Sequence, residues 1–210
     1  MAWIHWASLL LLLSCLAETS YGAVLLSSLP NTLDVFASPH KPDQPGLTPG
    51  GTWYFTDPII AGEDKLGVTW ALNNRSFPVG TDAPYRKVNV KLCYAPVSQV
   101  GRPERKTLDD LDKDKTCQFD IFAGQYNASS KWQFYESTLE RNVPAASYFV
   151  RAYVLDAAAV VVAYGQNTGP NKDYNIFEVQ ASSGSHKTVD IVFICFSAFC
   201  FLFLVGFFVA

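Results

Sequence analysis

Histidine and methionine are scarce in this sequence of 210 residues, which contains three of the former and one of the latter. Apart from the N-terminal stretch that holds His5, only His40 and His186 are available as bases or metal ligands. The sequence has no Gly-x-Ser-x-Gly, no His-Glu-x-x-His, no phosphate-binding glycine loop and no metal-spaced set of Cys and His. Cys93 also lacks the nearby histidines that a blue-copper centre requires. We therefore expect no catalytic residue, no metal site and no cofactor.

A strong charge of one sign is also missing. The sequence has 16 Lys and Arg against 19 Asp and Glu, which gives a net charge of −3. Nucleic acids and acidic membrane surfaces attract proteins through an excess of basic residues. No nucleic-acid partner is indicated, and no internal repeat is visible.

The N-terminus carries a short apolar run, in which leucines fill positions 9–13 and the apolar stretch ends near Ala17. It is too short to cross a bilayer, because a helical span takes about 20 apolar residues. Ser20 and Gly22 then supply the small residues of a signal-peptidase site. We expect residues 1–22 to be a cleaved signal peptide, with cleavage after Gly22 or, as second choice, after Ala23. The alternative is a buried helix that begins the fold.

The C-terminus carries a longer apolar run, since no charged residue occurs from Ile191 to Ala210. A helix of this length rises by roughly 30 Å, the thickness of the hydrocarbon core. We expect residues 187–210 to form one transmembrane helix, with the preceding domain outside the cytosol. The alternative is a glycosylphosphatidylinositol signal, because small residues at 181–184 precede the run. Its polar spacer would be shorter than the usual length of about 8–12 residues.

Residues 23–186, between these ends, are enough for one well-cored domain. Several runs alternate in polarity or are rich in β-branched and aromatic residues, which predicts strands. These runs are 68–72, 87–92, 132–135, 148–154, 159–164 and 176–179. Short strands between Gly, Pro and Asn turns predict a mostly β fold, an immunoglobulin- or fibronectin-like β-sandwich ectodomain. Four prolines and three glycines between 38 and 51 predict a loop there.

Only two cysteines, Cys93 and Cys117, fall between the expected signal peptide and the expected span. Exported proteins fold in an oxidising compartment, so we expect these two to form a disulfide worth about 3 kcal/mol. The alternative is a pair of buried free thiols. Two sequons, at Asn74 and Asn127, are expected glycosylation sites.

The loop between these cysteines, 93–117, is the most highly charged part of the sequence. Ten of the fifteen residues from 101 to 115 are charged, five of each sign. Thr107 is placed to cap a short helix, with Leu108 and Leu111 as its buried face. The loop is either a docking surface, since Arg suits bidentate contact with a carboxylate, or a solvated face of weak ion pairs. The candidate partner-binding residues are Arg102, Arg105, Lys106, Asp110, Lys113, Asp114 and Lys115.

Two blocks of the sequence are distinctive. The first is Lys87-Val88-Asn89-Val90-Lys91-Leu92-Cys93-Tyr94-Ala95-Pro96-Val97-Ser98-Gln99, which Arg105-Lys106 and Lys113-Asp114-Lys115-Thr116-Cys117 follow. The second is Tyr148-Phe149-Val150-Arg151-Ala152-Tyr153, which Asp156 and Ala163-Tyr164-Gly165-Gln166 follow. With Val68-Thr69-Trp70 and the order of signal, ectodomain and late span, these blocks closely resemble the plant high-affinity nitrate transporter-activating protein family.

The resemblance implies a non-catalytic accessory subunit at the plasma membrane. Its expected partner is a high-affinity nitrate/proton symporter of the major facilitator type, which it binds and stabilises, and it has no small-molecule substrate of its own. The resemblance singles out Arg105 and Asp114 as docking charges, whereas Arg151 and Asp156 match the family but are as readily structural. The span is expected to pack beside the helices of the symporter through small residues. The candidates for this packing are Ser197, Ala198 and Gly206.

Two positions depart from the family pattern, since Glu104 stands where we expect Trp and Gly101 where we expect an acidic residue. Both lie in the charged loop, so its contacts can differ in detail. The competing class is a cell-surface adhesion or receptor ectodomain, which composition and fold allow equally well. That class predicts self-association or binding of a soluble ligand, and no transporter that depends on this chain.

Overall fold

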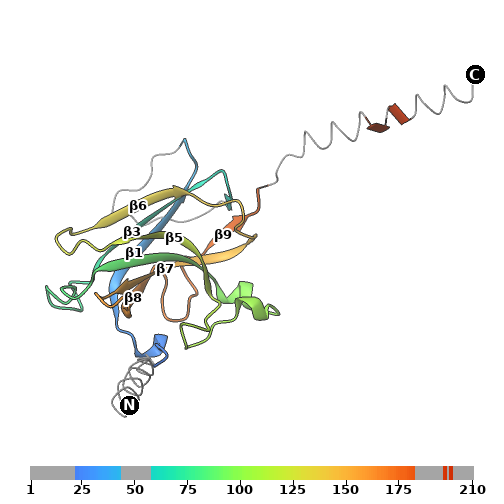
Figure 1. The fold of residues 1–210 in the computed structure, drawn as a ribbon. Helices are drawn as coiled ribbons and strands as arrows, with labels where there is room; N and C mark the ends of the chain where they lie inside the picture. Colours follow the sequence, from blue (N-terminus) through green and yellow to red (C-terminus); the bar gives the residue numbers. More distant parts are fainter. Residues whose placement is uncertain (1–21, 44–57, 183–195, 198, 201–210) are drawn as a thin grey trace, which may run out of the picture.

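The computed structural model describes residues 22–43, 58–182, 196–197 and 199–200 (Figure 1). Its strands are β1 (Asn31–His40), β2 (Ile59–Ile60), β3 (Lys65–Leu72), β4 (Lys87–Tyr94), β5 (Cys117–Gln125), β6 (Gln133–Thr138), β7 (Ala146–Leu155), β8 (Val161–Gln166) and β9 (Phe177–Gln180). Its 3-10 helices are η1 (Leu26–Ser28), η2 (Pro96–Gln99) and η3 (Pro103–Arg105). The prediction of a mostly β domain is confirmed.

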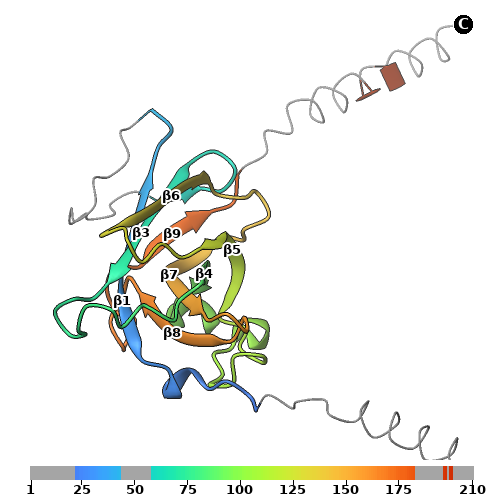
Figure 2. The ribbon, with the colours of Figure 1, turned by 60° about the vertical axis from the view of Figure 1, so that its left-hand side comes forward.

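The strands form one hydrogen-bonded sheet that folds back on itself around a common core (Figures 1 and 2). One layer has the antiparallel order β1-β3-β6, and the other has the order β8-β7-β4-β5. Strand β1 joins the layers because its first residues pair parallel with β8, while the rest pair antiparallel with β3. Strand β9 pairs antiparallel with the start of β7 and parallel with β2. This arrangement is that of an immunoglobulin-like sandwich.

Alternate residues of the central strands fill the space between the layers. On β4, Val88, Val90 and Leu92 are 0% exposed. On β3, Trp70 packs against Phe122 of β5 with 5.4 Å between ring centroids. Each large apolar side chain buried in this way stabilises the fold by about 1.5–3 kcal/mol. The alternation in polarity that predicted these strands is therefore the pattern that builds the core.

Strands β1 and β5 were not predicted, and each has a physical reason for being hard to recognise. Among the described strands β5 pairs only with β4, so it lies at an edge and none of its residues is fully buried. A bulge in that pairing interrupts its alternation near Ile121 and Phe122. In β1, the neighbouring Thr32 and Leu33 are both buried, because this strand passes from one layer to the other. Neither strand therefore shows a clean period of two.

The prediction of a loop over 38–51 is wrong at its start, because its first three residues end β1. There Pro39 pairs with Leu66 of β3. Strand β8 pairs with β1 only as far as Asp34, so in the described part of the chain no second strand lies beside Pro39 to need the backbone N–H that proline lacks. Residues 44–51 lie outside the described part of the chain.

The two predicted terminal segments lie mostly outside the described residues. This holds for the signal peptide, apart from Gly22, and for most of the span over 187–210, including Ala198 and Gly206. Ser197 is described, lies in a short helical stretch and is exposed. Among the residues that are described, no helix has the length and apolar character needed to cross a membrane.

Candidate functional site

The two cysteines of the ectodomain lie directly opposite each other. Cys93 is in β4, Cys117 begins β5, and the two are register partners joined by a disulfide. The predicted disulfide is confirmed, and the alternative of two buried free thiols is excluded. The bond closes residues 93–117 into what we call the disulfide loop, which projects from one end of the sandwich (Figure 1).

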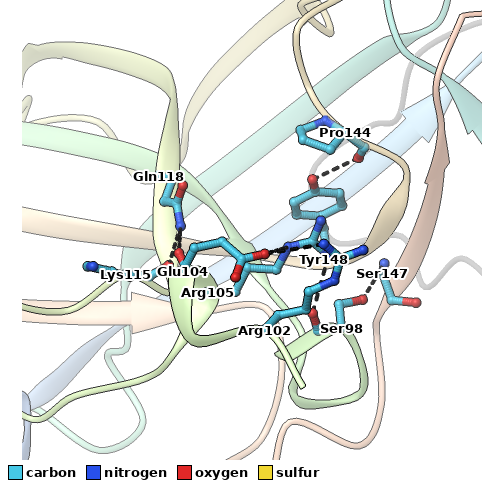
Figure 3. A network of polar contacts seen from close by, with 9 residues as sticks. All are labelled: Ser98, Arg102, Glu104, Arg105, Lys115, Gln118, Pro144, Ser147 and Tyr148. Carbon is cyan, nitrogen blue, oxygen red and sulfur yellow. Dashed lines mark hydrogen bonds and ion pairs between the residues drawn. The ribbon is translucent and has the colours of Figure 1, made fainter. Parts of the chain in front are cut away.

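Arg105 is packed at the base of the disulfide loop. Its guanidinium carbon lies 4.4 Å from the centroid of the Tyr94 ring, and its Nη1 donates to the carbonyl oxygen of Ser98 at 3.2 Å (Figure 3). Oε1 of Glu104 lies 3.8 Å from its Nε and 3.5 Å from Nη1 of Arg102. Only 13% of the Arg105 side chain is exposed, so most of its contacts are internal.

Hydrogen bonds hold the base of the loop at two further points (Figure 3). The side-chain amide of Gln118 donates to the carbonyl oxygens of Glu104 at 2.6 Å and Lys115 at 2.7 Å. The backbone N–H of Ser147, in β7, donates to Oγ of Ser98 at 2.8 Å. The loop is therefore continuous with the sandwich rather than loosely attached to it.

Asp114 organises the middle of the loop. Its Oδ1 accepts hydrogen bonds from the backbone N–H groups of Leu108 at 3.0 Å and Thr116 at 3.2 Å, and from the hydroxyl of Thr116 at 2.7 Å. The helix predicted from Thr107 is wrong, because the carbonyl oxygen of Asp109 and the backbone N–H of Leu111, which would lie inside it, pair with Leu26 and Val24 instead. Leu108, expected to be buried, is 37% exposed.

A segment that the sequence did not single out, Val24–Ser27, pairs with the disulfide loop. Leu26 donates its backbone N–H to the carbonyl oxygen of Asp109 at 2.7 Å, and Leu111 donates to that of Val24 at 3.0 Å. The backbone N–H and the hydroxyl of Ser27 both bind the Asp109 carboxylate at 2.7 Å. These bonds hold the pKa of Asp109 below its ordinary value. We call this contact the N-terminal clasp. Nothing in the sequence marks Ser27 as a partner of Asp109, because the two residues lie 82 positions apart.

The remaining predicted partner-binding residues face solvent to different degrees. Arg102, Lys106, Lys113 and Lys115 are exposed, and Asp110 is partly exposed. Nζ of Lys113 lies 2.6 Å from Oδ2 of Asp110, which lowers the pKa of Asp110 and raises that of Lys113. Within the described ranges, Lys106 and Lys115 form no ion pair.

Apolar side chains are exposed next to these cations. Val97 is 67% exposed and Val100 is 81% exposed, both within the disulfide loop, and Leu25 of the clasp is 41% exposed. The loop and the clasp together therefore present basic and apolar groups to solvent. Such a surface complements a partner that offers carboxylates and an apolar patch.

The two candidates from the second sequence block do not belong to this surface. Oδ1 of Asp156 accepts hydrogen bonds from the backbone N–H groups of Ala158 at 2.9 Å and Val160 at 3.0 Å, which closes the turn between β7 and β8. Arg151 is 1% exposed. The expected glycosylation sites, Asn74 and Asn127, are both exposed beyond strand ends, and their occupancy stays a prediction.

No metal site comes together among the residues that the structure describes. A cavity of about 140 Å³ lies between β5 and β6. It is lined mainly by apolar side chains such as Leu66, Phe119 and Tyr135, and its polar lining has no histidine or cysteine. The disulfide loop and the clasp are thus the candidate functional surface.

Known proteins resemble this chain over most of its length. Residues 26–184 match the family described as "High-affinity nitrate transporter accessory, Ig-like domain". "High-affinity nitrate transporter 3.1" of Arabidopsis thaliana is 46% identical over 180 residues, which cover 84% of this chain and 77% of the relative. "High-affinity nitrate transporter 3.2" of the same plant is 38% identical over 202 residues, 95% and 90% of the two chains. "High-affinity nitrate transporter-activating protein 2.1" of Oryza sativa subsp. japonica is 40% identical over 186 residues, 89% and 80% of the two chains.

Proposed function

We propose that this chain, which belongs to the family of high-affinity nitrate transporter accessory proteins with an Ig-like domain, binds a nitrate/proton symporter of the major facilitator type and stabilises it at the plasma membrane. The family accounts for the accessory role. The word "activating" in the name of a rice relative supports an effect on a transporter. Adhesion or receptor function, the competing class, has no comparable support.

The observation that carries the docking proposal is the construction of the disulfide loop. Its base is held by the disulfide, by Gln118 and by the stacking of Arg105 on Tyr94. Its outer surface carries exposed cations and exposed valines. A surface that is already ordered loses little conformational entropy on binding, which favours affinity.

The charged residues of the loop divide into two proposed roles. Arg102, Lys106 and Lys115 are exposed and contact carboxylates of the symporter. Arg105 and Asp114 hold the loop in shape, since their polar atoms bind groups of this chain. The ion pair of Asp110 and Lys113 holds the turn between these two residues. We therefore expect them to affect docking indirectly, by keeping the loop in its shape.

Activation of the symporter then requires no chemical reaction catalysed by this chain. A subunit that binds only the folded symporter raises the stability of that symporter by mass action, by about 2.7 kcal/mol at a concentration 100-fold above Kd. More symporter remains at the surface, and uptake rises. Catalysis by this chain has no place in the account.

The proposed setting is a single span over 187–210, with the sandwich outside the cytosol. Small residues let helices approach closely in a bilayer. We expect Ser197, Ala198 and Gly206 to lie where this helix packs beside the symporter.

The test is co-expression of this chain with a candidate symporter in oocytes, with measurement of labelled-nitrate uptake and of copurification from the surface. A double variant, Lys106→Glu with Lys115→Glu, should lose most of both. The matched control, Lys87→Glu with Lys131→Glu, changes two lysines that are also exposed but lie outside the loop, and should keep both. Uptake that is indifferent to the chain across several symporters would overturn the proposal and favour the adhesion class.

A further inference from the structure

The two layers of the sandwich are not joined by hydrogen bonds on the side where β5 and β6 lie. Among the described strands, β5 pairs only with β4 and β6 pairs only with β3, so each is the edge strand of its layer. Phe122 of β5 and Tyr135 of β6 cover part of this side, with 4.7 Å between their ring centroids. The cavity of about 140 Å³ lies between the same two edge strands.

The walls of this cavity are apolar and belong to the packed core. Leu66 of β3 and Leu92 of β4 are 0% exposed, and Val143, in the loop after β6, is 2% exposed. Phe119 and Ile121 of β5 complete the wall. In an engineered protein, an apolar cavity of about 150 Å³ takes up benzene. The cavity between β5 and β6 therefore has room for one side chain of the size of Leu or Phe.

The rim of the cavity is polar and reaches the surface. The lining includes three exposed residues, Asp120, Thr138 and Glu140. Nζ of Lys91 lies 2.9 Å from Oδ1 of Asp120, whereas within the described ranges no cation forms an ion pair with Glu140. The charge that stays uncompensated at the rim is negative, so a Lys or Arg of a partner complements it.

The cavity adjoins the base of the disulfide loop. Two residues of its wall, Leu92 and Phe119, lie within two positions of the cysteines of the disulfide. The centroid of the Phe119 ring lies 5.9 Å from that of Tyr94, the ring over which the guanidinium of Arg105 stacks at 4.4 Å. A partner that docks on the loop is therefore within reach of the cavity.

We propose that the cavity receives one apolar side chain, aromatic or branched, from the protein that docks on the disulfide loop, with a Lys or Arg of that protein beside Glu140. This inference rests on the proposed docking and adds an anchor to it. A side chain that fills a desolvated pocket contributes far more to binding than an exposed ion pair does. The cations of the loop then orient the partner and the cavity holds it. Only a side chain enters, so the hydrogen bonds of the flanking strands stay as they are.

The decisive variant is Ser137→Leu, which fills the cavity from within. Ser137 lines the cavity, and it is the register partner of the buried Leu66, so a leucine at this position points inward. Filling a cavity commonly stabilises a protein, so the variant should melt no lower than the wild-type chain. Ser137→Val fills less of the space and should give intermediate results. The matched control is Gln125→Leu, at an exposed position of β5 outside the lining.

The first measurement tests the cavity without the symporter, by thermal unfolding of the full chain in detergent with benzene, followed by tryptophan fluorescence. We expect a saturable rise in the melting temperature of the wild-type chain, by about 3–5 °C once free benzene is about tenfold above its Kd. Gluing the space shut with leucine should abolish this rise, and Gln125→Leu should keep it. No rise in the wild-type chain, or an equal rise in Ser137→Leu, would overturn the site.

The second measurement tests the occupant, by copurification of each variant with the symporter. Ser137→Leu should lower copurification by at least about tenfold, although its melting temperature has not fallen, and Gln125→Leu should keep it. Glu140→Lys should also lower it, because the new charge repels the cation of the partner. Glu178→Lys, at an exposed carboxylate of β9, is its control. Unchanged copurification in Glu140→Lys would overturn the cation at the rim.

The results distinguish a failure of the anchor from a failure of the docking proposal. If Lys106→Glu with Lys115→Glu loses copurification while Ser137→Leu keeps it, the anchor is overturned and docking on the loop stands. If the wild-type chain copurifies with none of several symporters, the docking proposal fails and the anchor fails with it.

Discussion

The sandwich core and the disulfide loop are stabilised by different interactions. In the core, apolar side chains such as Val88 and Leu92 are 0% exposed, and the strands pair along their lengths. In the loop, polar side chains bind backbone groups, as Asp114 binds the N–H groups of Leu108 and Thr116. Hydrophobic burial is spread over many contacts, whereas each of these hydrogen bonds depends on a single atom.

The difference means that the core provides most of the stability, whereas the loop is available to recognise a partner. Because the core supplies most of the burial, the loop can leave Lys106, Lys115 and Val100 exposed without loss of the fold. Single polar substitutions in the loop should therefore change docking more than stability, and apolar truncations in the core should do the reverse.

The largest expected effect is in the core. Leu92→Ala removes a side chain that is 0% exposed, and the cavity left behind should lower the free energy of unfolding by about 2–5 kcal/mol. Urea unfolding followed by fluorescence measures this change. Val97→Ala, at a side chain that is 67% exposed, is the control and should stay within about 0.5 kcal/mol of the wild-type chain. Similar losses for both would remove the distinction between the two regions.

The next effect is that of the disulfide. Replacing Cys93 and Cys117 by serine frees the unfolded chain from a crosslink over 24 residues, and should lower the free energy of unfolding by about 2–4 kcal/mol. Limited proteolysis should then cut the loop while the strands resist. Loss of the whole sandwich at 25 °C would show that the loop is part of the folding core.

A smaller change in stability, with a large change in docking, is expected for Asp114→Ala. The backbone N–H groups of Leu108 and Thr116 lose their acceptor, which should lower the free energy of unfolding by about 1–3 kcal/mol. Copurification with a symporter should fall at least tenfold in a chain that is still folded. Asp112→Ala, at an exposed neighbour, should keep it.

The smallest expected effect is a dependence on pH in the N-terminal clasp. Hydrogen bonds from Ser27 lower the pKa of Asp109 from its ordinary value of 3.8, so folding favours the ionised carboxylate. Its contribution is present above the ordinary pKa and is lost as the pH falls through the lowered one. Between pH 5 and pH 3 the melting temperature of the wild-type chain should fall further than that of Asp109→Asn. Parallel curves for the two chains would contradict this role of the clasp.

The sequence predicted those strands in which a regular pattern of apolar residues runs along the whole strand. The alternation over 87–92 predicted β4, which buries one face against the core, and the run of β-branched and aromatic residues over 148–154 predicted β7, which is buried on both faces. The prediction failed for β1 and β5, where a change of layer and a bulge break the period. The prediction also failed at Pro39. Proline usually ends a strand, but it is tolerated here because β8 does not extend along this part of β1.

For the candidate site, the sequence predicted the loop but not how its charges are used. Arg105 and Asp114 were expected to face a partner, yet their polar atoms bind Ser98, Leu108 and Thr116 of this chain. Such bonds depend on the path of the loop, which no local pattern encodes. The same holds for the clasp, whose partners are separated by 82 positions.

The most direct test of the central claim is hydrogen exchange of this chain, measured by mass spectrometry with and without the symporter. The account predicts that binding slows exchange in the disulfide loop over 97–115 and in the N-terminal clasp over 24–27, while exchange in the layer of β1, β3 and β6 is unchanged. Protection confined to that layer, with the loop unaffected, would contradict it.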